Sequence, residues 1–456
     1  MQPSTREILR IAFPVSLEFV VMLGLGLLNQ IIVGGLGDVA IAAVGFASSI
    51  TFILIVTLSA IGNSVGILVA RAFGGKQMHD INITTTAAIL LSVGGGLFFT
   101  AVPAIAPVWL LEVAGGSPAV VAAGAQYLQL ISLSLAPTLL AAVLAAVLRS
   151  TDHATSPLFA TTTSMVTNAA LAYALVWGVG PFPQIGIAGA GWATLMTALI
   201  KCGILGWQAF AVHHVAAWEM PRDKTEWRRI APPLFTLAIP MAITELVWTV
   251  GIYLYNVVFQ RLGDEPLAAA QIAANLENIF IIASIGLLTA ATALIGRAVG
   301  SNNVADVQTW IQRITRLGLV SGLTFGAIYA ATSLLVPNLF SNASTPVQSM
   351  AVQAIILNAI AQFIKVRNMI IGAGVLPSGN DLRGVIYGDV TGALLVGIPL
   401  AILFTTVFSW GFISVVIARL IDEVAKLAVF EWRLRKVDWH KVTGDHLASV
   451  SQSADV

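Results

Sequence analysis

Charged residues are scarce in this sequence: Asp, Glu, Lys and Arg make up 10% of its 456 residues, against 57% hydrophobic residues. A soluble globular protein normally carries about 25% charged residues. The scarcity of charge, with a mean hydropathy of +0.88, excludes a soluble globule and predicts an integral membrane protein embedded in the lipid bilayer. The net charge of +1 argues against nucleic acid as a partner, because nucleic-acid binding needs a basic face.

Cysteine and histidine are also rare. The single cysteine, Cys202, allows neither an intramolecular disulfide nor a thiolate metal site. The six histidines, at positions 79, 153, 213, 214, 440 and 446, fall in or beside expected loops. We therefore expect no metal site, no haem and no other cofactor.

Enzymatic motifs are missing as well. The sequence contains no HExxH motif and no Gly-rich phosphate loop, and no histidine falls inside an expected span. An intramembrane lipid-modifying enzyme stays open as an alternative, but we expect no catalytic residues and no enzymatic activity.

One long stretch occurs twice. Residues 12–76 align without a gap on residues 238–302, with sixteen identities in 65 pairs. Each copy consists of two long apolar segments joined by a Leu-Gly-Asp turn, at residues 36–38 and 262–264. A period of half the chain is typical of a duplicated membrane transporter.

Twelve apolar segments are long enough to be membrane-spanning helices, which need about 20 residues each. Lys and Arg gather in one set of connections, whereas the opposite set holds only Arg261. The positive-inside rule then places both termini and the long central connection in the cytoplasm. The expected segments are residues 8–34, 40–70, 81–111, 119–148, 155–180, 187–212, 232–260, 266–296, 306–336, 347–376, 382–408 and 410–433.

The predicted fold is an all-α polytopic membrane protein with two six-helix lobes. Because each lobe has an even number of spans, the lobes should be related by a pseudo-two-fold axis along the membrane normal, with a site in the cavity between them. The expected parts are an N-terminal lobe (1–212), a cytoplasmic linker (213–231), a C-terminal lobe (232–436) and a flexible cytoplasmic tail (437–456).

Residues 178–194 form a Gly/Pro-rich turn that leads into a Gly-Ala-rich helix. This stretch resembles the connection between the fifth and sixth helices of multidrug and toxic compound extrusion (MATE) transporters. Weaker matches follow in the family's order, at residues 66–75, 148–152, 271–275 and 376–381. The resemblance implies an inverted-V, two-lobed exporter that exchanges organic, often cationic, compounds for protons or sodium ions.

The sequence departs from the resemblance in the first span. MATE relatives commonly have an aspartate where this chain has Asn29, followed by Gln30. An amide cannot take up and release a proton near neutral pH. Asn29 could bind sodium or substrate through its carbonyl oxygen, or form an interhelical hydrogen bond.

Carboxylates inside spans are candidate ion or substrate sites, since each costs roughly 2.5 to 3.5 kcal/mol at the bilayer centre. Glu18 lies near the middle of the first span, where it could bond a neighbouring helix or face a cavity. In the seventh span, Glu245 heads a one-sided polar stripe that continues through Thr249 and Asn256. Glu277 lies deep in the eighth span, off a second stripe that includes Asn275, and could make an ion pair or contact substrate.

The tenth span carries a further polar stripe, formed by Asn358, Gln362, Lys365 and Asn368. We expect Lys365 to pair with a carboxylate of the same lobe, Glu245 before Glu277, either permanently or as a switchable pair. Arg367 lies about 200° further around the helix and should point elsewhere or pair with another span.

These features predict a secondary active multidrug exporter that works by alternating access, with a bacterial inner (plasma) membrane location and a monomeric state. The coupling ion, proton or sodium, is left open. A lipid-linked precursor flippase of the same wider superfamily is the main alternative, with Lys365 and Arg367 binding a phosphate.

Overall fold

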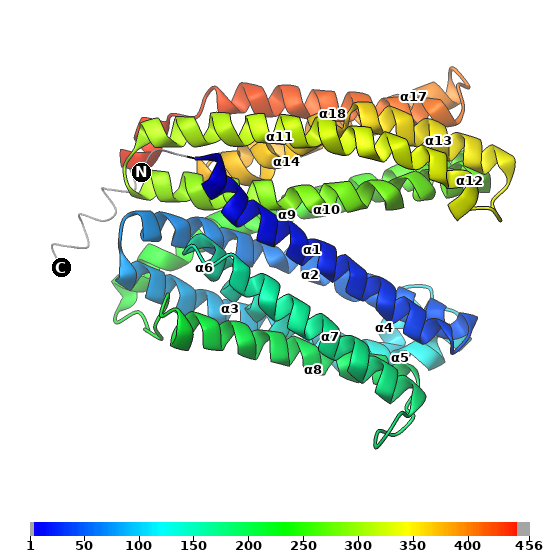
Figure 1. Ribbon diagram of the computed structural model, residues 1–456, viewed down its shortest axis with the longest axis horizontal. Helices are drawn as coiled ribbons and strands as arrows, with labels where there is room; N and C mark the ends of the chain where they lie inside the picture. The colour runs from blue at the N-terminus through cyan, green and yellow to red at the C-terminus, as the bar shows by residue number, and fades with distance from the viewer. Residues whose placement is uncertain (1–3, 445–456) are drawn as a thin grey trace. The chain divides into compact units, whose positions relative to one another are not determined.

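The structure, a computed structural model, describes residues 4–444 except the side chains of residues 25–27 and 229. All regular elements in that range are helices (Figure 1). The first half contains α1 (Thr5–Gly34), α2 (Asp38–Gly74), α3 (Met78–Ile105), α4 (Pro107–Val113), α5 (Pro118–Leu133), α6 (Leu135–Ser150), α7 (Thr155–Trp177), α8 (Ile187–Trp207) and η1 (Gln208–Val212). The second half contains α9 (Lys224–Leu262), α10 (Asp264–Gly300), α11 (Val304–Thr332), η2 (Ser333–Leu335), α12 (Val336–Leu339), α13 (Thr345–Ile360), α14 (Gln362–Met369), η3 (Ile370–Val375), α15 (Leu376–Ser378), α16 (Leu382–Asp389), η4 (Val390–Gly397), α17 (Ile398–Thr406) and α18 (Phe412–Leu434).

The described helices account for the twelve expected spans. Nine are long and apolar enough to cross a membrane by themselves, and the bent pair formed by α13 and residues 362–378 makes a tenth. The other two are α7, which is rich in Ser and Thr, and α18, which carries four charged residues between Arg419 and Lys426. These polar residues lower the hydropathy of both helices, although their lengths of 23 residues suffice for a span.

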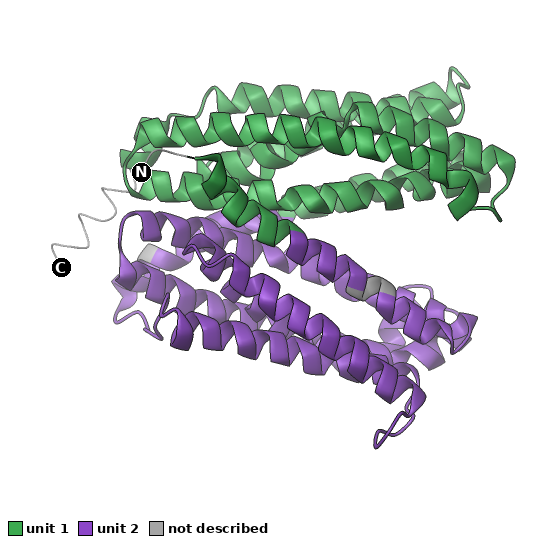
Figure 2. Ribbon diagram, in the orientation of Figure 1, with its two compact units in different colours: residues 1–16, 243–456 green, residues 17–242 purple. Residues whose placement is uncertain are grey.

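The chain divides into two compact units (Figure 2). Unit 1 consists of residues 1–16 and 243–456, and unit 2 of residues 17–242. Unit 2 thus includes the expected cytoplasmic linker and the beginning of α9, while the beginning of α1 counts with unit 1. The boundaries after Ser16 and after Ala242 fall at equivalent positions of the two sequence repeats.

The repeat is visible in the backbone. Gly37 and Gly263, which are equivalent in the alignment, precede α2 and α10 with φ angles of 100° and 122°. Lys76 and Asn302, also equivalent, both adopt the left-handed conformation, at φ 58° and 54°. The two copies therefore share turns as well as helices.

Glycines cap α2 and α10. Aspartate is a preferred N-cap residue, and the sequence alone favours Asp38 and Asp264 as caps, but the N-cap positions belong to Gly37 and Gly263, and neither cap has a side-chain hydrogen bond. A left-handed φ at the cap favours glycine over any residue with a Cβ atom. The aspartates begin the helices instead, where a negative charge is favourable near the N-terminus.

The turn at residues 178–186 has the geometry that its glycines suggest. Gly178, Gly180 and Gly186 have φ angles of 70°, 68° and 58°. In the helix that follows, a Cβ atom on Gly189 would lie 2.7 Å from the backbone of Leu175. The small residue therefore lets α8 pack closely against α7.

Each unit has its own apolar core. In unit 2, one core joins α2, α3, α6 and α8 around Leu144 and Leu148, and a second surrounds Tyr127 and Leu128 on α5. In unit 1, the main core surrounds Phe259 on α9 and Tyr329 on α11. These cores fix the rotation of each helix, and with it the direction of the polar side chains.

The beginning of the expected flexible tail is packed. Val437 contacts the small core around Leu376 and Phe430, and Trp439 is buried. Residues 445–456 lie outside the described part of the chain.

Candidate ion and substrate site

A buried ion pair stands at the bend of the tenth span. The helix breaks at Ala361 and turns by 55°, and Lys365 follows the break on α14. The ammonium of Lys365 donates to Glu277 of α10 and, over 3.0 Å, to the amide oxygen of Asn358 on α13. Lys365 and Glu277 are 8% and 5% exposed. Residues on three helical segments thus meet at the bend.

This pairing differs from the preferred expectation. The sequence favoured Glu245 over Glu277 as the partner of Lys365, but the ammonium binds Glu277. Both carboxylates lie deep in their helices, and their depth does not reveal which way each one faces. The packing of α10 against α14 turns Glu277 toward Lys365.

The charges of α18 extend this polar region. Asn368 of α14 donates through its amide nitrogen to the side chain and to the backbone carbonyl of Glu423, both over 2.8 Å. Lys365 also interacts electrostatically with Glu423. Glu423 lies near the middle of the 23-residue helix α18. A second carboxylate therefore stands within electrostatic range of the lysine.

A second ion pair follows along α18. The ammonium of Lys426 lies 3.4 Å from the carboxylate of Asp389 on α16. Tyr255 of α9 donates its hydroxyl to Asp422, at 3.0 Å. Gly392 of η4 is the small residue that lets this segment approach Asp422 closely. Along α18, Asp422 and Glu423 interact electrostatically with Arg419 and Lys426. The same charged residues also bind partners on α9, α14 and α16.

Glu245 is a further carboxylate near Asp389. It is half-buried on α9 and interacts electrostatically with Asp389. Two carboxylates within electrostatic range of each other repel, so a proton or a metal cation bound near them would be stabilised. Thr249, one turn further along α9, donates its hydroxyl to the backbone carbonyl of Glu245, at 2.8 Å.

Together these side chains form what we call the unit 1 charge cluster. It contains five carboxylates and three basic groups, and Arg419 contacts the ring of Tyr255 from 5.4 Å. Carboxylates therefore exceed basic groups by two. Its members are Glu245, Glu277, Asp389, Asp422, Glu423, Lys365, Arg419 and Lys426.

Other expected site residues of unit 1 lie outside the cluster or have no partner within the described residues. Asn256 accepts a hydrogen bond from Gln271 at 3.2 Å, and Asn275 is exposed on α10. Arg367 pairs with Glu431 on α18, with 2.6 Å between Nε and Oε1, so it points away from Lys365, as its spacing predicted. Gln362 is completely buried, and neither atom of its amide group has a hydrogen-bond partner among the described residues.

Unit 2 contains a smaller buried cluster around Glu18 on α1. One carboxylate oxygen lies 2.6 Å from the guanidinium of Arg149 on α6. The other accepts a hydrogen bond from Thr161 on α7 at 3.0 Å and lies 3.8 Å from the ammonium of Lys201 on α8. Glu18 is 1% exposed. The single carboxylate thus faces two basic groups. Lys201 forms its ion pair inside the protein and does not extend to the membrane surface.

Asn29 and Gln30 lie further along α1. Asn29 is half-buried, and its amide oxygen has no hydrogen-bond partner in the described part of the chain. Gln30 is exposed. Neither residue belongs to the Glu18 cluster.

Sequence reasoning missed Asp389, Asp422, Glu423 and Lys426 as site candidates. The available signal was depth, since Asp422 and Glu423 occupy the middle of the last span. Their i to i+4 spacing with Arg419 and Lys426 suggested self-neutralisation. The electrostatic contacts along α18 agree with that spacing, and further partners come from other helices.

Comparisons with known proteins agree with this architecture. The MatE family profile matches residues 14–174 and 240–403. A probable multidrug resistance protein NorM of Thermotoga maritima is 22% identical over 95% of this chain and 94% of its own length. A protein of the same name from Bradyrhizobium diazoefficiens is 27% identical, over 87% and 85%. An FAD transporter of Shewanella oneidensis is 23% identical, over 66% of each chain.

Solved structures share the fold. A MATE transporter of Vibrio cholerae superimposes with a TM-score of 0.87, at 16% identity, over 95% of this chain and 98% of that one. A MOP superfamily transporter from Pyrococcus furiosus, described as having a binding pocket of reverse polarity that suggests a different function, gives a TM-score of 0.84 at 20% identity, over 94% and 95%.

Proposed function

The chain belongs to the multidrug and toxic compound extrusion (MATE) family of membrane transporters, and we propose that it exports organic, cationic amphipathic compounds in exchange for protons or sodium ions. Transporter relatives imply small-molecule substrates and a multi-pass membrane location. The exchange mechanism, the charge of the substrate and the coupling ion belong to the proposal.

The excess of carboxylates over basic groups in the unit 1 charge cluster is the main observation that supports this proposal. A buried region with five carboxylates and three basic groups gains stability by binding a cation. Glu245 is the proposed binding group, because its electrostatic neighbour Asp389 is also acidic. A coupling ion and a cationic substrate that compete for this region would give exchange.

The pair of Lys365 and Glu277 is the proposed switch. Protonation of Glu277 would remove the charge that holds the ammonium, and the lysine would then depend on Asn358 and Glu423 alone. Because Lys365 follows the helix break at Ala361, a change in its partners would act on a segment that is already bent.

Transport by the purified protein in proteoliposomes tests this function. We expect a fluorescent organic cation to move against its gradient when an inward proton or sodium gradient is imposed. Glu245→Gln should stop gradient-driven movement and leave substrate binding measurable, since the amide keeps the shape of the side chain but does not titrate. The matched control is Glu265→Gln, which changes an exposed carboxylate of α10 that bonds Ser344. Transport by the unchanged protein that ignores both ion gradients would refute exchange.

A second candidate function is export of an organic anion, such as a lipid-linked phosphate or a dinucleotide. The Glu18 cluster favours it, because one carboxylate faces two basic groups there. The FAD transporter relative and the fold neighbour with a pocket of reverse polarity support it further. Movement of a labelled polyprenyl phosphate or of FAD, with no movement of the cation, would select this function.

The proposed setting follows from the loop charges and from the bacterial relatives. We place the protein in a bacterial inner membrane, as a monomer, with both termini in the cytoplasm.

A further inference from the structure

The connection between η1 and α9 is attached to the first three turns of α3. His79, Asn82 and Thr86 are spaced by three and four residues, so they share one face of α3. Asn82 accepts a hydrogen bond from the backbone of Ala217 at 2.8 Å, and Thr86 accepts one from the backbone of Glu219 at 3.2 Å. All of these residues belong to unit 2. We call residues 213–223 the docked linker.

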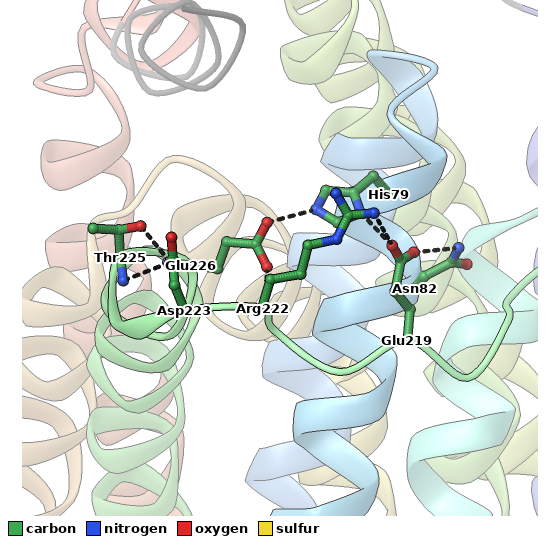
Figure 3. Close-up of polar contacts among 7 residues, drawn as sticks. All are labelled: His79, Asn82, Glu219, Arg222, Asp223, Thr225 and Glu226. Atoms are coloured by element: carbon green, nitrogen blue, oxygen red, sulfur yellow. Dashed lines mark hydrogen bonds and ion pairs between the residues drawn. The ribbon is translucent and has the colours of Figure 1, made fainter. Parts of the chain in front are cut away.

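His79 lies between two carboxylates (Figure 3). Its Nδ1 is 2.9 Å from Glu219 of the docked linker, and its Nε2 is 3.1 Å from Glu226 in the first turn of α9. The side chain of His79 is 40% exposed, and those of Glu219 and Glu226 are 26% and 21% exposed. One imidazole ring thus bridges the linker and a helix.

Hydrogen-bonding chemistry limits the protonation of this group. An ionised carboxylate only accepts hydrogen bonds, and a neutral imidazole has one N–H donor and one acceptor nitrogen. Two short contacts from one ring to two carboxylates therefore need one hydrogen more than a neutral histidine supplies. That proton can lie on the ring, as imidazolium, or on one carboxyl group. In either position, the docked arrangement binds one proton more than a neutral histidine with two ionised carboxylates would.

Other groups around the ring complete the charge balance. Arg222 lies 3.6 Å from Glu219, and its backbone N–H donates to Glu226 over 2.7 Å. Asn82 donates to the second carboxylate oxygen of Glu219. Further titratable or charged groups on the same segments are Lys76 and Asp80 beside His79, His213, His214 and Asp223 on the docked linker, and Lys224 on α9. The ring of His213 packs against that of His153, with 4.0 Å between the ring centroids, and its Nε2 lies 3.0 Å from the hydroxyl of Ser156.

We propose that attachment of the docked linker to α3 takes up one proton, held between His79, Glu219 and Glu226, and that this segment is a pH-sensitive latch. With the proton bound, the ring and Arg222 balance the two carboxylates. Without it, one hydrogen bond is lost and the two carboxylates face a neutral ring. Loss of this proton, as the pH on its side of the membrane rises, therefore opens the latch.

Release of the latch would free the first turn of α9. Glu226 belongs to that turn, whereas Val215 and Ala216 of the docked linker remain packed in an apolar core. The change is therefore confined to residues 217–226 and does not require unit 2 to unfold.

Hydrogen exchange of the full-length protein in lipid nanodiscs tests this proposal. Protection factors of the linker amides, corrected for the intrinsic effect of pH, should fall about two- to fivefold from pH 6 to pH 8, which is the size expected for exposed ionic contacts. His79→Gln should remove this pH dependence, because an amide does not titrate. His79→Arg should keep the linker protected at both pH values, since a guanidinium donates to two carboxylates without titrating.

A matched control distinguishes His79 from His214, which is a histidine of the docked linker. His214 has a φ angle of 48°, which asparagine tolerates, and it makes neither of the two carboxylate contacts. His214→Asn should keep the pH dependence of the unchanged protein. Equal protection at pH 6 and pH 8 in the unchanged protein would overturn the proposal, as would a full pH response in His79→Gln or its loss in His214→Asn.

Discussion

Lys365 on α14 binds Glu277 on α10, 88 positions earlier in the chain, directly after the break that bends the tenth span. Two residues further on, Arg367 binds Glu431. The first pair is buried, at 7% and 6% side-chain exposure, whereas the second is partly exposed, at 32% and 28%. The two basic residues therefore provide a comparison between a buried and an accessible ion pair.

Lys365→Met should destabilise the protein strongly. It leaves Glu277 buried without its cation, and breaking a buried pair in this way typically costs about 3–5 kcal/mol. Arg367→Met should cost about 1 kcal/mol or less, because Glu431 stays accessible to water. Denaturant titration of the protein in detergent measures the free energy of unfolding of both variants. The double variant Lys365→Met with Glu277→Gln should recover part of the loss, and equal losses in the two single variants would contradict this account.

Coupling should depend more on Glu245 than on Glu18. Glu18 is held by Arg149, Thr161 and Lys201, so Glu18→Gln should mainly lower stability, by an amount measurable in denaturant titration. In the same proteoliposomes it should retain more ion-driven transport than Glu245→Gln. If Glu18→Gln abolishes coupling and Glu245→Gln does not, the coupling site belongs to unit 2.

Asn29→Asp should be tolerated. The substitution keeps the side-chain oxygen of Asn29, which has no hydrogen-bond partner in the described part of the chain, and replaces the amide nitrogen by a second oxygen of similar size. A carboxylate at this half-buried position can titrate, and we expect a second pH dependence of transport beside that of the unchanged protein. Rates measured from pH 5.5 to about 8.5 would show it. Complete loss of transport would indicate that the amide itself binds the ion or the substrate.

Orientation in the membrane can be tested by thiol labelling. In a Cys202→Ser background, Asn342→Cys should react with an impermeant maleimide added outside, and Met220→Cys should react only after permeabilisation. Both positions are exposed, so a difference in reactivity reports the side of the membrane and not burial. The opposite pattern would reverse the predicted topology.

The attachment of the docked linker to α3 should also become less stable in acid. The hydrogen bond from Asn82, with smaller contributions from His79 and Arg222, lowers the pKa of Glu219 below its ordinary value of 4.5. A lowered pKa contributes stability above the unfolded value, and that contribution disappears as the pH falls through the folded value. Linker protection in hydrogen exchange should therefore decline below about pH 4.5. Asn82→Ala should reduce protection near pH 6 and make the acid decline smaller, and an unchanged decline would contradict this role for Asn82.

Hydropathy and charge spacing in the sequence determined the class of the protein, its twelve spans and its repeat. These properties are local: a run of apolar residues must form a helix in lipid whatever its neighbours are. The Leu-Gly-Asp turns could be placed for the same reason, and Arg367 could be separated from Lys365 by helical periodicity alone.

Tertiary packing decided which charges meet. Glu245 and Glu277 have similar depth, and only the rotation of α10 and the bend after Ala361 bring Glu277 to Lys365. The carboxylates of α18 could not be assigned to partners on α9, α14 and α16, because a contact between helices distant in the chain depends on helix rotation, which the apolar cores set. His79 was placed in a loop region by sequence, but its two carboxylate partners lie 140 and 147 positions away and are brought to it by the path of the linker.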